Sequence, residues 1–273
     1  MHAQKAELFR SLHQGKMLVL PNAWDVASAR VFEKAGFPAV ATSSAGIAAS
    51  FGYPDGQNIP MEEMLRAVAR IAGQLDVPLS ADLEGGYAAN ADEMRQITRM
   101  LLDCGAAGLN LEDGLGVGAL PIIHTSQHVE KIRVVREVSQ AAGIPLVINA
   151  RTDIYWKNIG DPANRFAHAV HRGNMYLAAG ADCVFVPGVS DAGTIADLAR
   201  EIRGPLNILA APGTPRLAEL ASLGVARVTF GSGPMRATLG LLERLASEIL
   251  SNGTFDSMNT GAMPYVKSNA LFR

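Results

Sequence analysis

The sequence is poor in charge, in cysteine and in long apolar runs. Charged residues make up 18% of its 273 positions and the formal net charge is −2, so it lacks the basic surplus typical of nucleic-acid-binding proteins. The two cysteines, Cys104 and Cys183, are too few for a disulfide framework, and we interpret both as reduced core residues of a cytoplasmic protein. No apolar run reaches the ~18 residues of a membrane span, and the first residues lack the apolar segment of a signal peptide. We therefore expect neither nucleic acid nor membrane as a partner.

Hydrophobic residues are plentiful in contrast, at 48%, and they follow a repeating order. A helical stretch ends at glycine, which readily adopts the left-handed conformation of a helix cap, and a short apolar run follows. Eight such runs are predicted to be strands, near residues 17–21, 38–43, 78–83, 108–112, 145–150, 182–187, 206–210 and 227–231. Continuous apolar strands that alternate with helices indicate a parallel sheet, and eight of them indicate an α/β fold, the (β/α)8 TIM barrel.

The chain shows no internal boundary before its last residues. No linker, low-complexity segment or charge block divides it, so residues 1–250 are predicted to form a single barrel domain. The extension 251–273 opens with glycine, asparagine and serine beyond the expected eighth helix. We expect this extension to be irregular or docked on a neighbouring subunit.

The strongest functional signal is a group of acidic residues at predicted strand ends. Asp82 and Glu84 lie at the end of the third strand and Glu112 ends the fourth, at the barrel mouth where active sites of this fold lie. Clustered carboxylates favour a hard divalent cation, and magnesium prefers few direct protein ligands and several waters. We predict a magnesium site in which Asp82 binds directly while Glu84 and Glu112 hold waters of the ion. The alternative is that these acids cap the following helices or pair with Arg151.

Three other segments supply candidate contacts. Arg151 ends the fifth strand, and its rigid donor fork suits a substrate carboxylate, although it could also pair with Glu112. The small residues 42–46 follow the second strand, where free backbone N–H groups could meet an anion or the segment could simply cap a helix. Asp55 lies in a Gly-Tyr-Pro-Asp-Gly segment whose composition by itself indicates a turn.

Two glycine-rich segments are less specific. Residues 114–118 imitate a dinucleotide-binding fingerprint, but Pro121 and two isoleucines follow instead of a helix, and we interpret the segment as a loop that closes over the site. Residues 230–233 could bind phosphate, as in a phosphate-sugar barrel enzyme, yet one Gly-Ser-Gly is common. No histidine falls at a predicted strand end, which argues against zinc.

Several of these segments together resemble the isocitrate lyase/phosphoenolpyruvate mutase superfamily. The resemblance runs over nearly the whole chain and is most specific in residues 43–55, Asp82–Tyr87, Leu111–Asp113 and Ala150–Asp153. It implies that substrate, a 2-oxo acid, is bound by Ser43, Ser44, Ala45 and Arg151, with Trp24 of the segment Pro21–Asp25 as a further candidate.

The same resemblance implies the remaining roles. Asp55, Asp82, Glu84 and Glu112 would form the magnesium environment, with Arg151, Glu112 and Asp55 as catalytic residues. Members of the superfamily exchange the eighth helix between subunits, so we expect a homodimer or homotetramer in which the helix Met235–Leu250 is swapped.

One loop departs from the family pattern. Isocitrate and methylisocitrate lyases carry a Lys-Lys/Arg-Cys-Gly-His signature after the fourth strand, whereas residues 114–125 contain neither cysteine nor lysine. The thiol that would protonate the leaving carbanion is missing, which disfavours methylisocitrate lyase activity, and the chain looks most like the phosphoenolpyruvate phosphonomutase-like members. We predict a lyase dependent on Mg²⁺, with Mn²⁺ as substitute, that cleaves a small 2-oxo acid through an enolate. The bond would be C–C, as in oxaloacetate decarboxylation, or C–P, as in a phosphonopyruvate-like substrate; the alternative is a non-catalytic protein that binds 2-oxo acid and magnesium.

Overall fold

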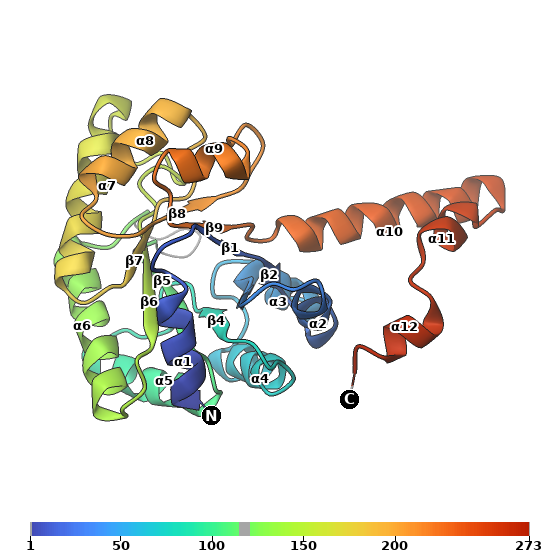
Figure 1. Cartoon of the computed structure of the whole chain (residues 1–273), viewed down its shortest axis with the longest axis horizontal. Helices are drawn as coiled ribbons and strands as arrows, with labels where there is room; N and C mark the ends of the chain where they lie inside the picture. The colour runs from blue at the N-terminus through green and yellow to red at the C-terminus, as the bar shows by residue number, and fades with distance from the viewer. Residues whose placement is uncertain (1, 115–120, 273) are drawn as a thin grey trace.

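The computed structural model describes residues 2–114 and 121–272, which form a parallel barrel surrounded by helices (Figure 1). All strand pairs are parallel, and the strand order is β1-β9-β8-β7-β6-β5-β4-β3-β2. This arrangement confirms the predicted (β/α)8 barrel. None of the helices in the described ranges combines the length and the hydropathy that a membrane span requires.

The strands are short and the helices between them cover the outside of the barrel. In the described residues the strands are β1 (Leu18–Leu20), β2 (Asn22–Ala23), β3 (Val40–Thr42), β4 (Leu79–Asp82), β5 (Gly108–Glu112), β6 (Val147–Arg151), β7 (Cys183–Phe185), β8 (Leu206–Leu209) and β9 (Arg227–Thr229). The helices are α1 (His2–Ser11), α2 (Val26–Lys34), α3 (Ser44–Ser50), α4 (Met61–Ala72), α5 (Ala91–Asp103), α6 (Thr125–Ala141), α7 (Pro162–Ala178), α8 (Ala192–Glu201), α9 (Leu217–Ser222), α10 (Gly233–Asn252), α11 (Asp256–Gly261) and α12 (Tyr265–Asn269).

The barrel closes through a strand that proline divides in two. β1 pairs with β9 and β2 pairs with β3, while Pro21 between them has no N–H to donate and only accepts a bond from Ala41 N at 2.8 Å. The side chain of Asn22 bridges the break, because its Oδ1 accepts the backbone N–H groups of Phe230 and Gly231 at 2.8 and 3.0 Å. The prediction of eight strands is therefore corrected to nine in the described chain, the first being split.

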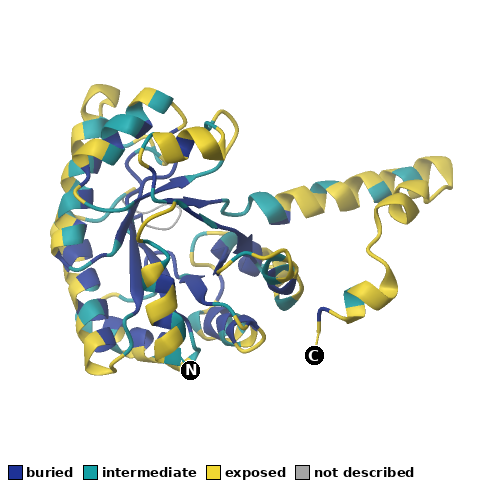
Figure 2. Cartoon of the chain, in the orientation of Figure 1, coloured by how far each residue is buried: buried dark blue, intermediate teal, exposed yellow. Residues whose placement is uncertain are grey.

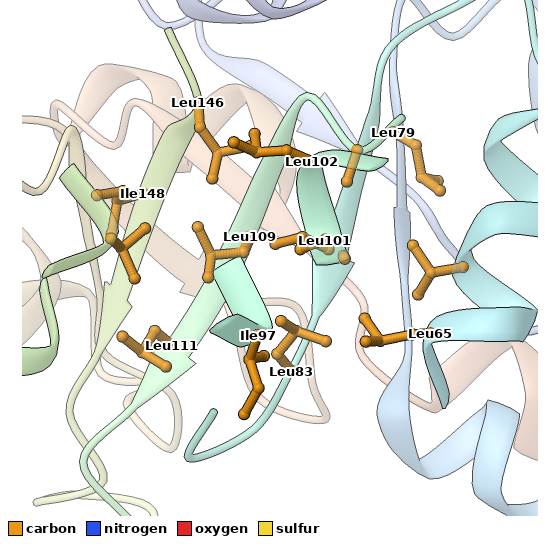
Figure 3. Packing of buried hydrophobic residues seen from close by; sticks show 14 of the residues in the cluster. Leu65, Leu79, Leu83, Ile97, Leu101, Leu102, Leu109, Leu111, Leu146 and Ile148 are labelled. Atoms are coloured by element: carbon orange, nitrogen blue, oxygen red, sulfur yellow. The ribbon is translucent and has the colours of Figure 1, made fainter. Parts of the chain in front are cut away.

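Apolar side chains on the outer strand faces pack beneath the helices. In Figure 3, Leu109 and Leu111 of β5 lie between Ile148 of β6 and Ile97 and Leu101 of α5. All five side chains are buried, and each contributes about 1.5–3 kcal/mol relative to an exposed position. This packing holds β5 and β6, whose carboxyl ends carry Glu112 and Arg151.

Helix α1 packs into the opposite, amino-terminal end of the barrel. Phe9 is fully buried and clusters with Leu18 and Leu20 of β1 and with Val147, the first residue of β6. A Cβ atom at Gly108 would lie 2.6 Å from Phe9 Cε1 and 2.8 Å from the Val147 carbonyl oxygen. Glycine at position 108 is therefore what admits the aromatic ring.

Residues 233–272 form an arm that leaves the barrel. Helix α10 projects away from it, α11 packs near the far end of α10, and α12 lies on the part of the chain that runs back toward the barrel (Figure 1). The arm is mostly exposed, and Leu239, Leu242 and Ile249 are each at least half exposed (Figure 2). Its end returns to the barrel, where the Leu271 carbonyl accepts a bond from Arg30 Nε of α2 at 2.6 Å. The extension that we expected to be irregular or docked on a partner contains two short helices, α11 and α12. The Glu248 carboxylate accepts the backbone N–H groups at the start of α11, which caps that helix.

Candidate active site

A cavity of about 290 Å³ opens at the carboxyl ends of the strands. Its size is at the small end of ligand pockets, and it would hold about ten water molecules. It combines acidic, basic and apolar side chains, and it is lined by Asn22, Ser43, Ser44, Ala45, Asp55, Asp82, Asn110, Arg151, Trp156, Phe185, Pro187, Leu209, Ala210, Ala211, Pro212, Thr229, Phe230, Gly231, Ser232 and Arg236. The cavity therefore suits a small acid rather than a large cofactor.

Asp82 presents one carboxylate oxygen without a protein partner. Its Oδ2 accepts bonds from Ser44 N at 3.0 Å and from Ser44 Oγ at 2.8 Å, and its own N–H donates to Thr42 Oγ1. The other oxygen, Oδ1, is buried and has no hydrogen-bond partner in the described part of the chain. A buried carboxylate oxygen in this state is a ready ligand for a cation or a water.

Glu84 is held behind the cavity by a strained backbone and two neighbours. Its φ is +51°, a conformation uncommon for a non-glycine residue. Its Oε2 accepts from Gln57 N at 2.7 Å and its Oε1 from Tyr87 Oη at 3.4 Å. Burial, followed by the charges of Asp82 and Asp55, raises the pKa of Glu84 to about 7. Near neutral pH this carboxyl group can therefore hold or release a proton.

Glu112, Arg151 and Asp153 form a buried ion network beside Asp82. Arg151 Nη1 lies 2.9 Å from Glu112 Oε2, and Arg151 Nε lies 2.6 Å from Asp153 Oδ1. Burial raises the pKa of Glu112 above its ordinary value, and the Arg151 guanidinium opposes this shift. The same guanidinium carbon lies 5.9 Å from the Trp156 ring centre and 5.7 Å from that of Phe185. Two acids and two aromatic rings thus fix Arg151 at the cavity wall.

The segment after β3 only partly meets the expectation of free amides. Ser43 caps α3 by accepting from Gly46 N, and its own N–H donates to the Ala23 carbonyl. The Ser44 N–H is taken by Asp82, so neither serine amide is free for an anion. Within the described residues, the Ala45 N–H has no partner, and it belongs to the first turn of α3, where unpaired donors are expected. The predicted anion-binding amides therefore reduce to Ala45.

Two other predicted residues have different outcomes. Asp55 does line the cavity, and partial desolvation followed by the Asp82 charge raises its pKa. Trp24 is not among the residues that line it, so the substrate contact of Trp24 stays a prediction. Trp24 lies instead along an apolar groove with Phe51 and Phe272, packed so closely under α3 that a Cβ at Gly46 would lie 2.7 Å from its own Cβ.

The charges of Asp82, Glu84 and Glu112 affect one another, but these side chains are not arranged as a complete set of metal ligands. Among the described residues, no group of three or more His, Cys, Asp or Glu side chains has an arrangement that could hold a metal ion. The charges of Asp82 and Glu84 nevertheless reach Glu112, since both contribute to raising its pKa. One orphaned oxygen on Asp82 with two acids behind it fits magnesium, which takes few direct protein ligands and keeps several waters.

Several cavity residues were not found from the sequence. Asn110 lies two residues before Glu112 on β5, so strand alternation could have placed it on the same inward face. Trp156 and Phe185 carry no such signal, because their role depends on the packing around Arg151. The loop predicted to close over the site, residues 114–118, lies outside the described residues except for Gly114.

Comparison with known proteins assigns the chain to a family. A family model described as phosphoenolpyruvate phosphomutase matches residues 9–250. The chain belongs to this family. It is similar to an uncharacterized protein of Mycobacterium tuberculosis strain H37Rv (37% identity, 83% of this chain and 82% of that protein). It is also similar to 2-methylisocitrate lyase of Escherichia coli K12 (27% identity, 84% of this chain and 79% of that one).

Solved structures agree with this assignment. A candidate lyase/mutase from Burkholderia cenocepacia J2315 superposes with a TM-score of 0.92 at 35% identity, covering 98% of this chain and 96% of that one. A phosphonopyruvate hydrolase in complex with oxalate and Mg²⁺ gives a TM-score of 0.85 at 22% identity, covering 98% and 94%, and at that identity the likeness shows the fold alone. The family and its structural neighbours thus include lyases, mutases and hydrolases.

Proposed function

We propose that this protein is a magnesium-dependent lyase that cleaves a small 2-oxo acid through an enolate, with manganese able to replace magnesium. The observation that carries the proposal is the buried, unpartnered Oδ1 of Asp82 in a small cavity that also contains Arg151 and the Ala45 amide. The complex of a phosphonopyruvate hydrolase with oxalate and Mg²⁺, on the same fold, supports a divalent cation here. The bond cleaved is C–C, as in oxaloacetate decarboxylation, or C–P, as in a phosphonopyruvate-like acid.

The residues of this chain divide the work between the two ends of the substrate. Asp82 would hold the ion directly and Glu84 and Glu112 its waters, and the ion supplies Lewis-acid stabilisation of the developing enolate charge. Arg151 offers a cation to the substrate carboxylate, and Glu112 and Asp153 keep its guanidinium oriented.

Apolar side chains line another part of the cavity, which also contains Arg236. Phe185, Pro187 and Leu209 would exclude water from the bound acid, which strengthens electrostatic interactions inside.

Two alternatives are tested alongside. A non-catalytic member of the family would bind a 2-oxo acid with magnesium and release no product. Methylisocitrate cleavage is disfavoured because residues 114–125 lack the cysteine of that signature, although the similarity to 2-methylisocitrate lyase keeps it in the substrate panel.

The deciding experiment measures pyruvate release, by a coupled dehydrogenase, from oxaloacetate, phosphonopyruvate and methylisocitrate, with Mg²⁺ and with a chelator. The matched control is Asp82→Asn, which keeps the shape but removes the charge, and it corrects for decarboxylation by free metal. We expect metal-dependent release from one of the first two acids that falls at least 100-fold in the variant. Binding without release supports the non-catalytic alternative, cleavage of methylisocitrate contradicts the loop argument, and neither binding nor release refutes the proposal.

The assembly and location of the protein are also proposals. The exposed leucines of the arm support a homodimer or homotetramer in which α10 is exchanged between subunits. The reduced cysteines and the low net charge are compatible with a cytoplasmic protein.

A further inference from the structure

Asn110 connects the site cavity to two buried polar residues inside the barrel. It lines the cavity and is 5% exposed. Its Oδ1 accepts a bond from Asn149 Nδ2 of β6 at 2.6 Å, and Arg227 Nη2 of β9 approaches the same oxygen at 3.5 Å. Asn149 and Arg227 are both fully buried. The orientation of the Asn110 amide is therefore set from inside the barrel.

Arg227 decides which end of that amide faces inward. A guanidinium carries donors only, so it attracts the carbonyl oxygen of Asn110 and repels its NH2 group. In the part of the chain that the structure describes, its Nε and Nη1 have no hydrogen-bond partner, so the Asn110 oxygen compensates a strongly under-satisfied cation. Burial lowers the pKa of Arg227 to about 10, which still leaves it charged at neutral pH.

The consequence concerns the other end of Asn110. With Oδ1 directed at Arg227 and Asn149, the Nδ2 group is left for the cavity, and no described residue accepts a hydrogen bond from it. The cavity also contains two further donors, Arg151 and the Ala45 amide. Its Asp82 carboxylate, on the strand paired with that of Asn110, is an acceptor whose charge the proposed cation would offset. A ligand that matches this arrangement carries several anionic oxygens close together.

We propose that Asn110 is a substrate-contacting residue that donates a hydrogen bond from Nδ2 to a carboxylate or enolate oxygen of the bound acid, and that Arg227 is the positioning residue that fixes the amide in this orientation. This inference rests on the proposed function for the identity of the ligand. Asn110 adds a neutral donor to the positive charge of Arg151. Removing one fixed donor of this kind from a developing oxyanion reduces kcat by about 10²–10³ in other enzymes.

The first test needs no ligand. A neutron or atomic-resolution X-ray structure of the free protein distinguishes Nδ2 from Oδ1 at Asn110. The inference requires the oxygen on the side of Arg227; the opposite assignment overturns it, whatever the protein binds.

The second test compares two isosteric variants by calorimetric titration with oxalate in the presence of Mg²⁺. Asn110→Asp replaces the donor by an acceptor that repels the ligand, so we expect at least tenfold weaker binding with little change in the thermal midpoint. Asn207→Asp is the control: Asn207 is a fully buried β8 residue that does not line the cavity, and its Oδ1 already accepts a bond from Thr229. Equal loss in both variants, or no loss in Asn110→Asp, contradicts the direct contact.

The third test addresses Arg227. Arg227→Met frees the Asn110 amide to rotate, and we expect weaker oxalate binding that Arg227→Lys largely restores, because lysine also donates only. If Arg227→Met does not fold, the lysine variant and the amide orientation still decide the positioning role. If the wild-type protein binds no oxalate with magnesium, the proposed function fails separately, while the orientation of Asn110 is still measured.

Discussion

Arg151 is the residue whose removal tests the site most directly. Its guanidinium lies 2.9 Å from Glu112 and 2.6 Å from Asp153, and the Asp153 side chain is fully buried. Arg151→Met keeps a similar volume, leaves Glu112 without its paired cation, and leaves Asp153 with the more distant Lys157 Nζ at 3.9 Å. Removing one partner of a buried ion pair costs about 3–5 kcal/mol.

The size and pH dependence of the effect follow from the structure. For a chain of this length 1 kcal/mol corresponds to a shift in the unfolding midpoint of about 2–4 °C, so the variant should unfold roughly 6–20 °C lower. Arg151 opposes the increase in the pKa of Glu112, so its loss raises that pKa further. A carboxyl group whose pKa is higher in the folded than in the unfolded protein makes the folded state less stable as the pH rises from the lower to the higher of these two pKa values. The destabilisation should therefore be larger at pH 8 than at pH 5.5.

Thermal unfolding by circular dichroism at these two pH values measures both effects. Arg151→Lys is the control, because it keeps the charge and loses the forked geometry, and it should recover a large part of the midpoint. The double variant Arg151→Met with Glu112→Gln should be more stable than Arg151→Met at pH 8. A loss that is equal at both pH values, or no loss at all, would refute the assignment of Arg151 as the compensating cation.

Three further predictions concern other parts of the chain. Because the pKa of Glu84 is raised to about 7, the wild-type protein should lose up to about 3 kcal/mol of unfolding free energy between pH 4.5 and 8, and Glu84→Gln should lack this part of the pH dependence in denaturant titrations. Gly108→Ala should cost about 1–3 kcal/mol through contact with the Phe9 ring, and Phe9→Leu in the same chain should recover part of it in thermal melts; no recovery would contradict the packing. Leu239→Glu with Leu242→Glu should lower the mass measured by light scattering, whereas the exposed control Glu243→Gln should not; a monomeric wild type would argue against the exchanged arm.

The fold was predictable because its signal is repeated along the chain. Each glycine-capped helix followed by an apolar run indicates one helix–strand unit of the barrel. The predicted strands overlap those observed. The split at Pro21 was harder to predict from the sequence. At this break the side-chain oxygen of Asn22, rather than a backbone carbonyl, accepts the N–H groups of Phe230 and Gly231.

The site was predictable only at the level of which strand ends carry it. Asp55, Asp82 and Arg151 do meet in one cavity, as their positions indicated. Trp24 does not, because the chain turns into α2 immediately after β2, and its side chain packs beneath α3. The pairing of Ser44 with Asp82 and the approach of Arg227 to Asn110 join residues 38 and 117 positions apart, and such contacts depend on side-chain geometry that spacing does not encode.

The arm described above begins inside the wall of the cavity. Ser232, immediately before α10, and Arg236, in its first turn, both line the site, and the rest of α10 continues outward as one unbroken helix. A tilt of the distal end would therefore displace Arg236 at the proximal end. A molecule that binds the arm, including a second copy of this chain, could therefore change the width of the cavity by moving Arg236.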